Sequence, residues 1–262
     1  MKDKVVVVTG ASAGIGAALA RLVAARGGVP VLIARREREL QEAAARSGAQ
    51  ALAVVGDVTR REDVARARDA ALQRFSRIDA WVNNAGRGIT RTVSELTDED
   101  FDEMMLVNVK SALYGMQAVL PHFRRRGSGQ IVNVSSMLGR IPFAPQRSAY
   151  SAAKHALNAL TANLRMELAP AHPGITVSCV HPGVVATEFG SNARHGGIDS
   201  RKIPGAQTAE EVAAVIADLL EQPRADVYTR PGAQQSVVRY YAAEDMASAE
   251  QEMAFVLPPP RA

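Results

Sequence analysis

The chain has 262 residues, of which 47% are hydrophobic and 22% are charged. These values are close to the globular average, so they exclude disorder, collagen and coiled coil as descriptions of the whole chain. The length suits one large α/β domain. The formal net charge is +4, and basic residues alternate with acidic ones, so we expect no nucleic-acid partner. The basic run Arg124–Arg126 falls where a helix should end, where cations complement the helix dipole.

Membrane and export signals are missing from the pattern. The longest apolar runs, such as Val5–Val8, are far shorter than the roughly 20 residues that a membrane-spanning helix needs. The opening Met1–Lys4 and the early Thr9-Gly10 do not resemble a secretory signal. Cys179 is the only cysteine, which excludes an internal disulfide and fits a reducing compartment. We therefore expect a cytoplasmic protein with no membrane partner.

Short β-branched runs alternate along the chain with longer segments that carry apolar residues at helical spacing. The expected strands are 4–9, 29–34, 50–55, 78–83, 129–135, 175–180 and, more weakly, 226–229. The expected helices are 15–26, 37–47, 61–75, 98–125, 148–169 and 208–221, and a helical pattern returns at 236–255. Capping residues are expected at Thr59, at Thr97 with Asp100, and at Thr208 with Glu211. This alternation predicts a single α/β domain with a parallel sheet covered on both faces.

The first expected strand runs directly into a glycine-rich turn, Thr9-Gly10-Ala11-Ser12-Ala13-Gly14-Ile15-Gly16, and a helix follows at once. Glycines permit a tight turn and bring the backbone close to a pyrophosphate, which the positive end of the helix dipole then holds. The spacing differs from the GxGxxG fingerprint, and a glycine turn can also be a simple connection. Its position at the first strand–helix turn favours nucleotide binding.

The second expected strand ends in Ala34-Arg35-Arg36, without the acidic residue that would bind the ribose of NAD. The arginine fork matches the geometry of a 2′-phosphate, although both arginines could instead be solvated residues of the next helix. The missing acid and the added base together favour NADP(H).

Tyr150 and Lys154 are four residues apart, which places them on one face of a helix. A free tyrosine has a pKa of about 10, and a nearby ammonium stabilises its phenolate. Taken alone, such a pair is common by chance and is usually a surface pair, so it gains meaning only beside the other motifs.

Together these motifs resemble the short-chain dehydrogenase/reductase family. The resemblance rests on four ordered motifs: Thr9-Gly10-x-x-x-Gly14-Ile15-Gly16, Asn83-Asn84-Ala85-Gly86, Tyr150-x-x-x-Lys154 and Pro182-Gly183-x-x-x-Thr187. It covers residues 4 to about 187 closely. It implies a Rossmann-type, doubly wound sheet of about seven parallel strands, which we place in a domain over 1–235. Residues 188–206 show little periodicity and are either disordered or a substrate lid, and the returning helical pattern marks a tail at 236–262. It also implies a nicotinamide cofactor, and hydride transfer between a carbonyl and an alcohol.

The resemblance also implies roles for individual residues. Tyr150 would be the acid/base, Lys154 would lower its pKa and bind the nicotinamide ribose, and Ser136 would bind the substrate oxygen. Asn108 would help to hold a water that links Lys154 to solvent. Besides Tyr150 and Lys154, the implied cofactor-binding residues are Gly10, Ser12, Gly14, Ile15, Gly16, Arg35, Arg36, Asp57, Val58, Asn84, Ala85, Gly86, Pro182, Gly183, Val185 and Thr187. Among these, Ser12 and Arg35 match the positions that meet the 2′-phosphate.

Some assignments have alternatives. Asp57 could cap the next helix, and Asn108 could be a polar residue that bends its helix. Ser135 competes with Ser136, because adjacent residues of a strand point to opposite faces; the family pattern selects Ser136. The stretch from Ser136 to Tyr150 is about one residue longer than is usual in the family, which could alter the substrate wall at Leu138–Pro145.

The sequence therefore predicts an NADP(H)-dependent oxidoreductase acting on a small carbonyl or alcohol substrate. Met137, Leu138, Phe143 and Phe189 suggest a mainly apolar pocket, in which His195 might also touch the substrate. A silent NADP(H)-binding sensor or assembly protein is disfavoured by the intact catalytic set, and a sugar-nucleotide epimerase by the chain length. No metal site is expected, because the histidines show no ligand spacing. In the family that the chain resembles, the helices at 98–125 and 148–169 commonly build the subunit interface, so the resemblance implies a homodimer or homotetramer.

Overall fold

A computed structural model describes residues 1–254, and it contains one parallel seven-stranded sheet with the order β3-β2-β1-β4-β5-β6-β7. The strands are β1 (Val5–Thr9), β2 (Val29–Ala34), β3 (Leu52–Val55), β4 (Ala80–Asn83), β5 (Gly129–Val134), β6 (Ile175–His181) and β7 (Asp226–Tyr228). Every residue of β1 and β2 is buried, as expected for strands covered on both faces. The strand order reverses between β1 and β4, and a doubly wound sheet binds its ligand at such a point.

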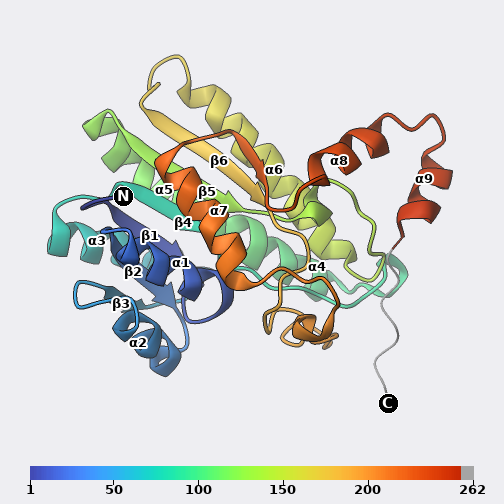
Figure 1. Cartoon of the computed structure of the whole chain (residues 1–262), viewed down its shortest axis with the longest axis horizontal. Coiled ribbons are helices and arrows are strands. Elements are labelled where there is room, and N and C mark those ends of the chain that lie inside the picture. The colour runs from blue at the N-terminus through green and yellow to red at the C-terminus, as the bar shows by residue number, and fades with distance from the viewer. Residues whose placement is uncertain (255–262) are drawn as a thin grey trace.

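Six helices cover the two faces of the sheet (Figure 1). The first face packs against α1 (Gly14–Ala25), α2 (Glu37–Ala45) and α7 (Ala209–Glu221). The second packs against α3 (Arg61–Phe75), α5 (Ser111–Arg126) and α6 (Ser148–Leu168). The predicted Rossmann-type single domain is therefore confirmed. Within residues 1–254, no helix combines the length and the apolar composition that a bilayer-spanning segment requires.

The segment predicted as one helix over 98–125 is interrupted. It consists of α4 (Asp98–Met105), a π-helical turn over Leu106–Lys110, and α5. Asn108 lies in this turn, where its side-chain amide donates hydrogen bonds to the carbonyl oxygens of Arg87 (2.9 Å) and Met104 (3.1 Å). Such side-chain bonds to the main chain compete with regular helical pairing. The expectation that Asn108 could distort its helix is consistent with this geometry.

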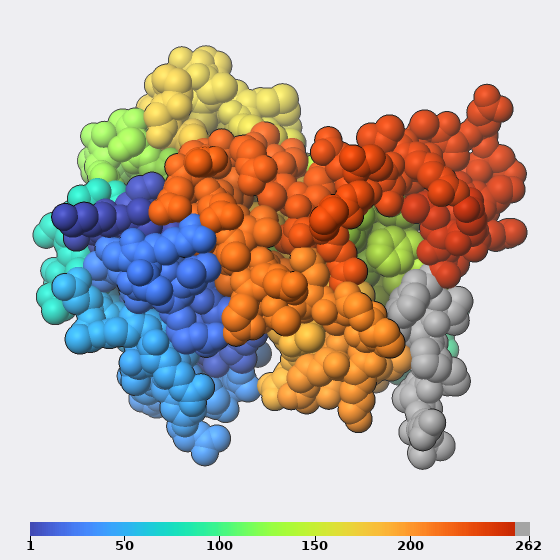
Figure 2. All heavy atoms as spheres, in the orientation of Figure 1, coloured from blue at the N-terminus to red at the C-terminus, as the bar shows by residue number. Residues whose placement is uncertain are grey.

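The C-terminal helical pattern is also divided, into α8 (Ala233–Tyr241) and α9 (Met246–Met253). Asp245 separates the two helices, because its carboxylate caps the start of α9 by accepting hydrogen bonds from the amides of Ala247 and Ser248. Together α8 and α9 form an arm that projects from one end of the molecule, drawn in red (Figure 2). The predicted tail extends to residue 262, and its part from 255 onward lies outside the described residues.

Two of the three predicted caps are confirmed. Thr97 with Asp100 and Thr208 with Glu211 form capping boxes at the starts of α4 and α7. The prediction for Thr59 is wrong: Arg60 occupies the cap position of α3, and the hydroxyl of Thr59 donates to Asp57 instead.

Candidate active site

The carboxyl ends of the strands open into a cleft of about 1210 Å³. Nearly all the residues named from the sequence line it, among them Gly10, Tyr150 and Thr187. Gly16 and Asn108 do not line it; they lie behind its wall. The cleft thus brings together segments from both halves of the chain.

The glycine-rich turn after β1 forms the floor of this cleft. Gly10 and Gly14 have φ angles of +66° and +54°, which a side chain would strain. A Cβ placed on Gly10 would lie 2.8 Å from Ala85 Cα, and one placed on Gly16 would lie 2.6 Å from the carbonyl oxygen of Gly10. Helix α1 begins here, and no side chain caps it. Its first amide groups can therefore face an anionic ligand.

β2 is followed directly by Arg35 and Arg36, and neither of these two positions carries an acidic residue. Arg36 Nη2 donates to the hydroxyl of Ser12 at 3.3 Å. Arg35 is turned outward with 71% of its side chain exposed, and its Nη1 lies 3.9 Å from Asp57 Oδ2. The guanidinium beside Ser12 therefore belongs to Arg36, whereas the family pattern pairs Ser12 with Arg35.

The wall after β3 and β4 is held by main-chain contacts. Asp57 Oδ1 accepts from the amide and the hydroxyl of Thr59, so its carboxylate closes a local turn. The hydroxyl of Thr9 accepts from the amides of Asn84 and Ala85 at 2.9 and 3.0 Å. These bonds fix the segment from Asn84 to Gly86 against the glycine-rich turn.

The backbone near residues 86 and 87 connects Asn108 with Lys154. A Cβ on Gly86 would lie 2.8 Å from Asn108 Oδ1 and 3.6 Å from Lys154 Nζ. Asn108 Oδ1 also accepts from the amide of Arg87 at 3.2 Å. Asn108 thus holds the backbone of residue 87 next to the lysine.

Ser136, Tyr150 and Lys154 meet at the inner end of the cleft. Burial raises the pKa of the Tyr150 hydroxyl to about 12, while its interactions with Ser136 and Arg147 oppose that rise. Burial lowers the pKa of Lys154 to about 8. The ammonium donates to the carbonyl oxygen of Val134 at 2.9 Å and lies 5.6 Å from the centre of the tyrosine ring. Two buried titratable groups with strongly displaced pKa values are typical of a reactive site.

The two adjacent serines have different surroundings. The Ser136 hydroxyl interacts with Tyr150 and accepts from the amide of Leu138 at 3.1 Å. The Ser135 hydroxyl instead faces the carbonyl oxygen of Lys154 at 3.4 Å. This arrangement supports the choice of Ser136 made from the family pattern.

The segment after β6 closes the cofactor side of the cleft. A Cβ on Gly14 would lie 3.2 Å from Thr187 Cγ2, so Thr187 adjoins the glycine-rich turn. The carbonyl oxygen of Pro182 accepts from the amide of Met137, and Arg230 packs against Gly183. Val185 is buried and pairs with Gln207 in an isolated parallel bridge.

An ion-pair cluster ties the 188–206 segment to α4. Arg194 contacts Asp100 and Glu103, and Glu103 Oε1 also accepts from Arg87 Nη1 at 2.5 Å. His195, with φ +63°, bonds Asp100 at 2.7 Å. The suggestion that His195 might touch a substrate gains no support, because its ring is bound to Asp100 and the residue does not line the cleft.

The expected apolar residues Met137, Leu138, Phe143 and Phe189 do line the cleft. Charged side chains that were not predicted from the sequence line it as well, among them Arg87, Glu103 and Arg147. For Arg147, the composition of the sequence offered one signal: no aspartate or glutamate occurs between Glu103 and Glu167. An arginine in that stretch can find a carboxylate only on a distant segment.

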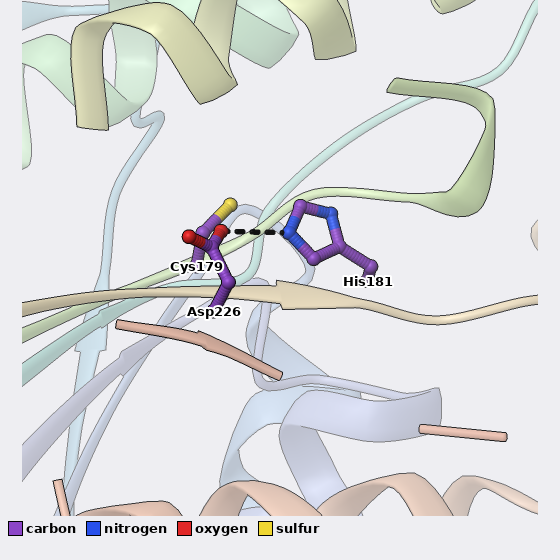
Figure 3. Close-up of side chains that lie close together, drawn as sticks. All are labelled: Cys179, His181 and Asp226. Atoms are coloured by element: carbon purple, nitrogen blue, oxygen red, sulfur yellow. Dashed lines mark hydrogen bonds and ion pairs between the residues drawn. The ribbon is translucent and has the colours of Figure 1, made fainter. Parts of the chain in front are cut away.

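A second cluster, Cys179, His181 and Asp226, lies on β6 and β7 (Figure 3). Its ligand atoms lie within 4.8 Å of one another, as a metal would require. However, Asp226 Oδ1 already accepts from His181 Nε2 (3.0 Å) and Arg140 Nη2 (2.7 Å), and Arg165 Nη1 stands 3.6 Å from Oδ2. Burial raises the pKa of the Cys179 thiol to about 12, which opposes the thiolate form that metals bind. Its chemistry fits an ion-pair cluster between the strands better than a cation site.

Comparison with known proteins agrees with the fold and the motifs. The protein-family model described as short chain dehydrogenase matches residues 4–197 of this chain. YxnA of Bacillus subtilis, an uncharacterized oxidoreductase, is 35% identical over 235 residues, a match that covers 87% of this chain and 65% of that protein. This chain therefore spans somewhat less than two thirds of that relative.

Solved structures show the same likeness. An alcohol dehydrogenase from the archaeon Thermococcus sibiricus, complexed with 5-hydroxy-NADP, is 30% identical with a TM-score of 0.76, covering 86% of this chain and 95% of that one. A 3-ketoacyl-(acyl-carrier-protein) reductase from Brucella melitensis, complexed with NADH, is 29% identical with a TM-score of 0.78, covering 87% and 96%. The chain belongs to the short-chain dehydrogenase/reductase family, and it is an oxidoreductase of that family.

Proposed function

We propose that the protein is an NADP(H)-dependent oxidoreductase that interconverts a carbonyl group and a secondary alcohol on a small substrate. The observation that carries this proposal is the grouping of Ser136, Tyr150 and Lys154 at the inner end of a cleft whose outer end is a glycine-rich turn. The relatives that bind NADP and NADH have the same fold.

The cleft fits a dinucleotide. Gly10 and Gly14 line the cleft without a side chain, so a ligand there would meet main-chain groups and the start of α1. Gly10, Gly14, Ile15, Asp57, Val58, Asn84, Ala85, Gly86, Val185 and Thr187 would hold the rest of it along the cleft. When bound, the nicotinamide supplies or accepts the hydride.

A preference for NADP(H) follows from charge. Ser12, Arg35 and Arg36 stand where the adenosine ribose would lie in this fold, and β2 ends without a carboxylate. A guanidinium binds a phosphate through charge-assisted hydrogen bonds, and an acidic residue there would repel it. The outward turn of Arg35 and the contact of Arg36 with Ser12 make Arg36 the principal candidate.

Tyr150 is the proposed proton donor and acceptor. Its pKa of about 12 keeps the hydroxyl protonated at neutral pH, so in carbonyl reduction it can give a proton to the substrate oxygen. In alcohol oxidation the same oxygen takes the proton back. Ser136 would orient the substrate oxygen by a hydrogen bond.

Lys154 supports this proton transfer electrostatically. Its pKa of about 8 leaves the ammonium charged at neutral pH, close enough to stabilise a tyrosinate. Asn108 holds the backbone beside the lysine and so helps to keep it in place. A silent nucleotide-binding protein would not need these four side chains together, so the alternative reading is not favoured.

The experiment that tests the proposal combines a substrate panel with one variant. Aldehydes, ketones, steroids and secondary alcohols are screened for NADPH oxidation or NADP reduction by absorbance. With a working substrate, Tyr150→Phe should lower kcat by about 100- to 10,000-fold, because proton transfer by a positioned side chain is worth about that factor. NADPH affinity should stay nearly unchanged. Turnover of Tyr150→Phe at the wild-type rate would rule out the assigned proton donor.

A further inference from the structure

Arg147 is a half-buried cation next to the proposed proton donor. It immediately precedes α6, which carries Tyr150 one turn further on, and it lines the cleft. A Cβ on Gly88 would lie 3.0 Å both from Arg147 Nη1 and from Phe189 Cε1, so these two side chains adjoin. The ring of Phe189 in turn lies edge-on to Tyr150, with 5.5 Å between their centres.

No carboxylate neutralises this guanidinium. Across residues 1–254, Arg147 has no acidic group within 4.0 Å, whereas the neighbouring cleft residue Arg87 is paired with Glu103. Within the part of the chain that the structure describes, its side chain makes one hydrogen bond, from Nη1 to the carbonyl oxygen of Ile89 at 3.0 Å. Burial lowers the pKa of Arg147, yet a guanidinium remains charged at any physiological pH. A half-buried charge without a carboxylate partner is incompletely solvated, so its position beside the reactive groups favours an anionic ligand.

A purely structural role explains the arginine less well. Residues 89–91 are already joined to the start of α6 by other bonds: the amide of Arg91 donates to the carbonyl oxygen of Gln146 (2.8 Å), and the hydroxyl of Ser148 donates to that of Arg91 (2.7 Å). These bonds do not involve the guanidinium. Among the described residues, one of its five donors has a partner and would serve as a brace, which leaves the others available to a ligand.

We propose that Arg147 binds a carboxylate group of the substrate, so that the protein acts on oxo acids and the corresponding hydroxy acids. This assignment rests on the proposed function, because it places the substrate at Tyr150. The apolar part of the acid would contact Leu138, Phe143 and Phe189, which line the same cleft. Arginine forms two parallel hydrogen bonds with a carboxylate, which fixes the orientation of the acid as well as its affinity.

A binding experiment tests the assignment without turnover. The affinities of phenylacetate and of its neutral amide, phenylacetamide, are measured by calorimetry for the wild type and Arg147→Met, with and without saturating NADPH. The wild type should bind the acid about 10- to 100-fold more tightly than the amide, since a charge-assisted pair contributes about that factor. Arg147→Met should lose this preference, and Arg147→Lys, which retains the charge without the fork, should keep part of it. If Arg147→Met does not fold, Arg147→Lys takes its place in the test. The proposal then requires that Arg147→Lys bind phenylacetate measurably less tightly than the wild type does.

A kinetic pair separates the two proposals. The substrate 4-oxo-4-phenylbutanoate and its methyl ester are compared in the wild type, Arg147→Met and the control Arg87→Met, which removes a paired arginine of the same cleft. Only Arg147→Met should lower kcat/KM selectively for the acid, by about 10- to 100-fold. An equal effect on acid and ester, or no preference for phenylacetate in the wild type, overturns the carboxylate assignment. An Arg147-dependent preference in binding without turnover of any carbonyl compound overturns the proposed function and leaves the carboxylate site standing.

Discussion

The two ends of the cleft hold their charges in opposite environments. At the cofactor end, Arg35 and Arg36 leave 71% and 45% of their side chains exposed and lie 3.8–4.0 Å from their acidic neighbours. At the substrate end, Lys154 is 3% exposed and Tyr150 7% exposed, and no carboxylate balances the lysine among the described residues. The first end can bind anions at little cost to the fold. The substrate end holds the ammonium of Lys154, which would be more stable in water than it is in the folded protein.

This contrast separates stability from binding. An exposed arginine can be replaced with little change in the free energy of unfolding, because water and salt already screen its charge. A buried ammonium without a carboxylate partner destabilises the folded protein unless it titrates. Substitutions at the substrate end should therefore change stability and activity in opposite directions, whereas those at the cofactor end should change ligand affinity alone.

The largest effect on stability is expected for Lys154→Met in the cofactor-free protein. The pKa of Lys154 is about 8 in the folded protein and about 10.4 in an unfolded chain, so keeping it charged below pH 8 costs about 3 kcal/mol. Methionine removes this cost and leaves the carbonyl oxygen of Val134 without its donor, which costs about 1 kcal/mol. The net gain at pH 7 should be about 2 kcal/mol, measured by urea unfolding.

The pH dependence gives an independent check of the same substitution. Between pH 8 and about 10.4 the unfolded lysine binds a proton that the folded one has released, so the wild type should gain stability as the pH rises through this window. The variant should lack this gain. A variant that is less stable than the wild type at pH 7, or that keeps the rise, would show that the ammonium is not destabilising. Catalysis should fall in either case.

The next largest effect concerns the exposed arginines. Arg36→Ala should weaken NADPH binding by about 10- to 100-fold, and Arg35→Ala by less, because Arg36 adjoins Ser12. NADH binding should change little in either variant, and the free energy of unfolding should stay within about 0.5 kcal/mol. Protein fluorescence reports the affinities. Arg38→Ala is the matched control, since Arg38 is exposed in the first turn of α2, just after Arg36, and does not line the cleft. Equal affinities for NADPH and NADH in the wild type would remove the proposed preference.

The same contrast explains how much the sequence could predict. The cofactor end depends on glycines, a serine and arginines that lie in the first two strand–helix turns, and the alternation of elements predicted the parallel sheet that carries them. The order of the motifs therefore led to Gly10–Gly16, Arg35 and Arg36 directly. It did not determine which arginine would face Ser12, because that depends on side-chain orientation rather than on spacing.

The substrate end was less predictable, because distant segments build it. The contacts of Arg194 with Asp100 and Glu103 join residues more than 90 positions apart. Outside the cleft, the cluster of Cys179, His181 and Asp226 likewise depends on a long-range contact, the pairing of β6 with β7. The break of the 98–125 helix at Asn108 requires a bond to residue 87, which helical periodicity cannot reveal.

The smallest expected effect is that of the ion pairs that hold the 188–206 segment, and Arg194→Met tests it. Arg194 is 30% exposed and contacts Asp100 and Glu103, which are 0% and 21% exposed. Its loss should loosen the segment that carries Phe189 without touching Ser136, Tyr150 or Lys154. A partly exposed ion pair contributes about 1 kcal/mol, so KM should rise roughly three- to tenfold while kcat changes little. Arg201→Met, which removes a more exposed pair with Asp199 in the same segment, should change KM by less. A fall in kcat with an unchanged KM would mean that the ion pairs position the proton-transfer groups instead of the substrate wall, and the separation of the two roles would fail.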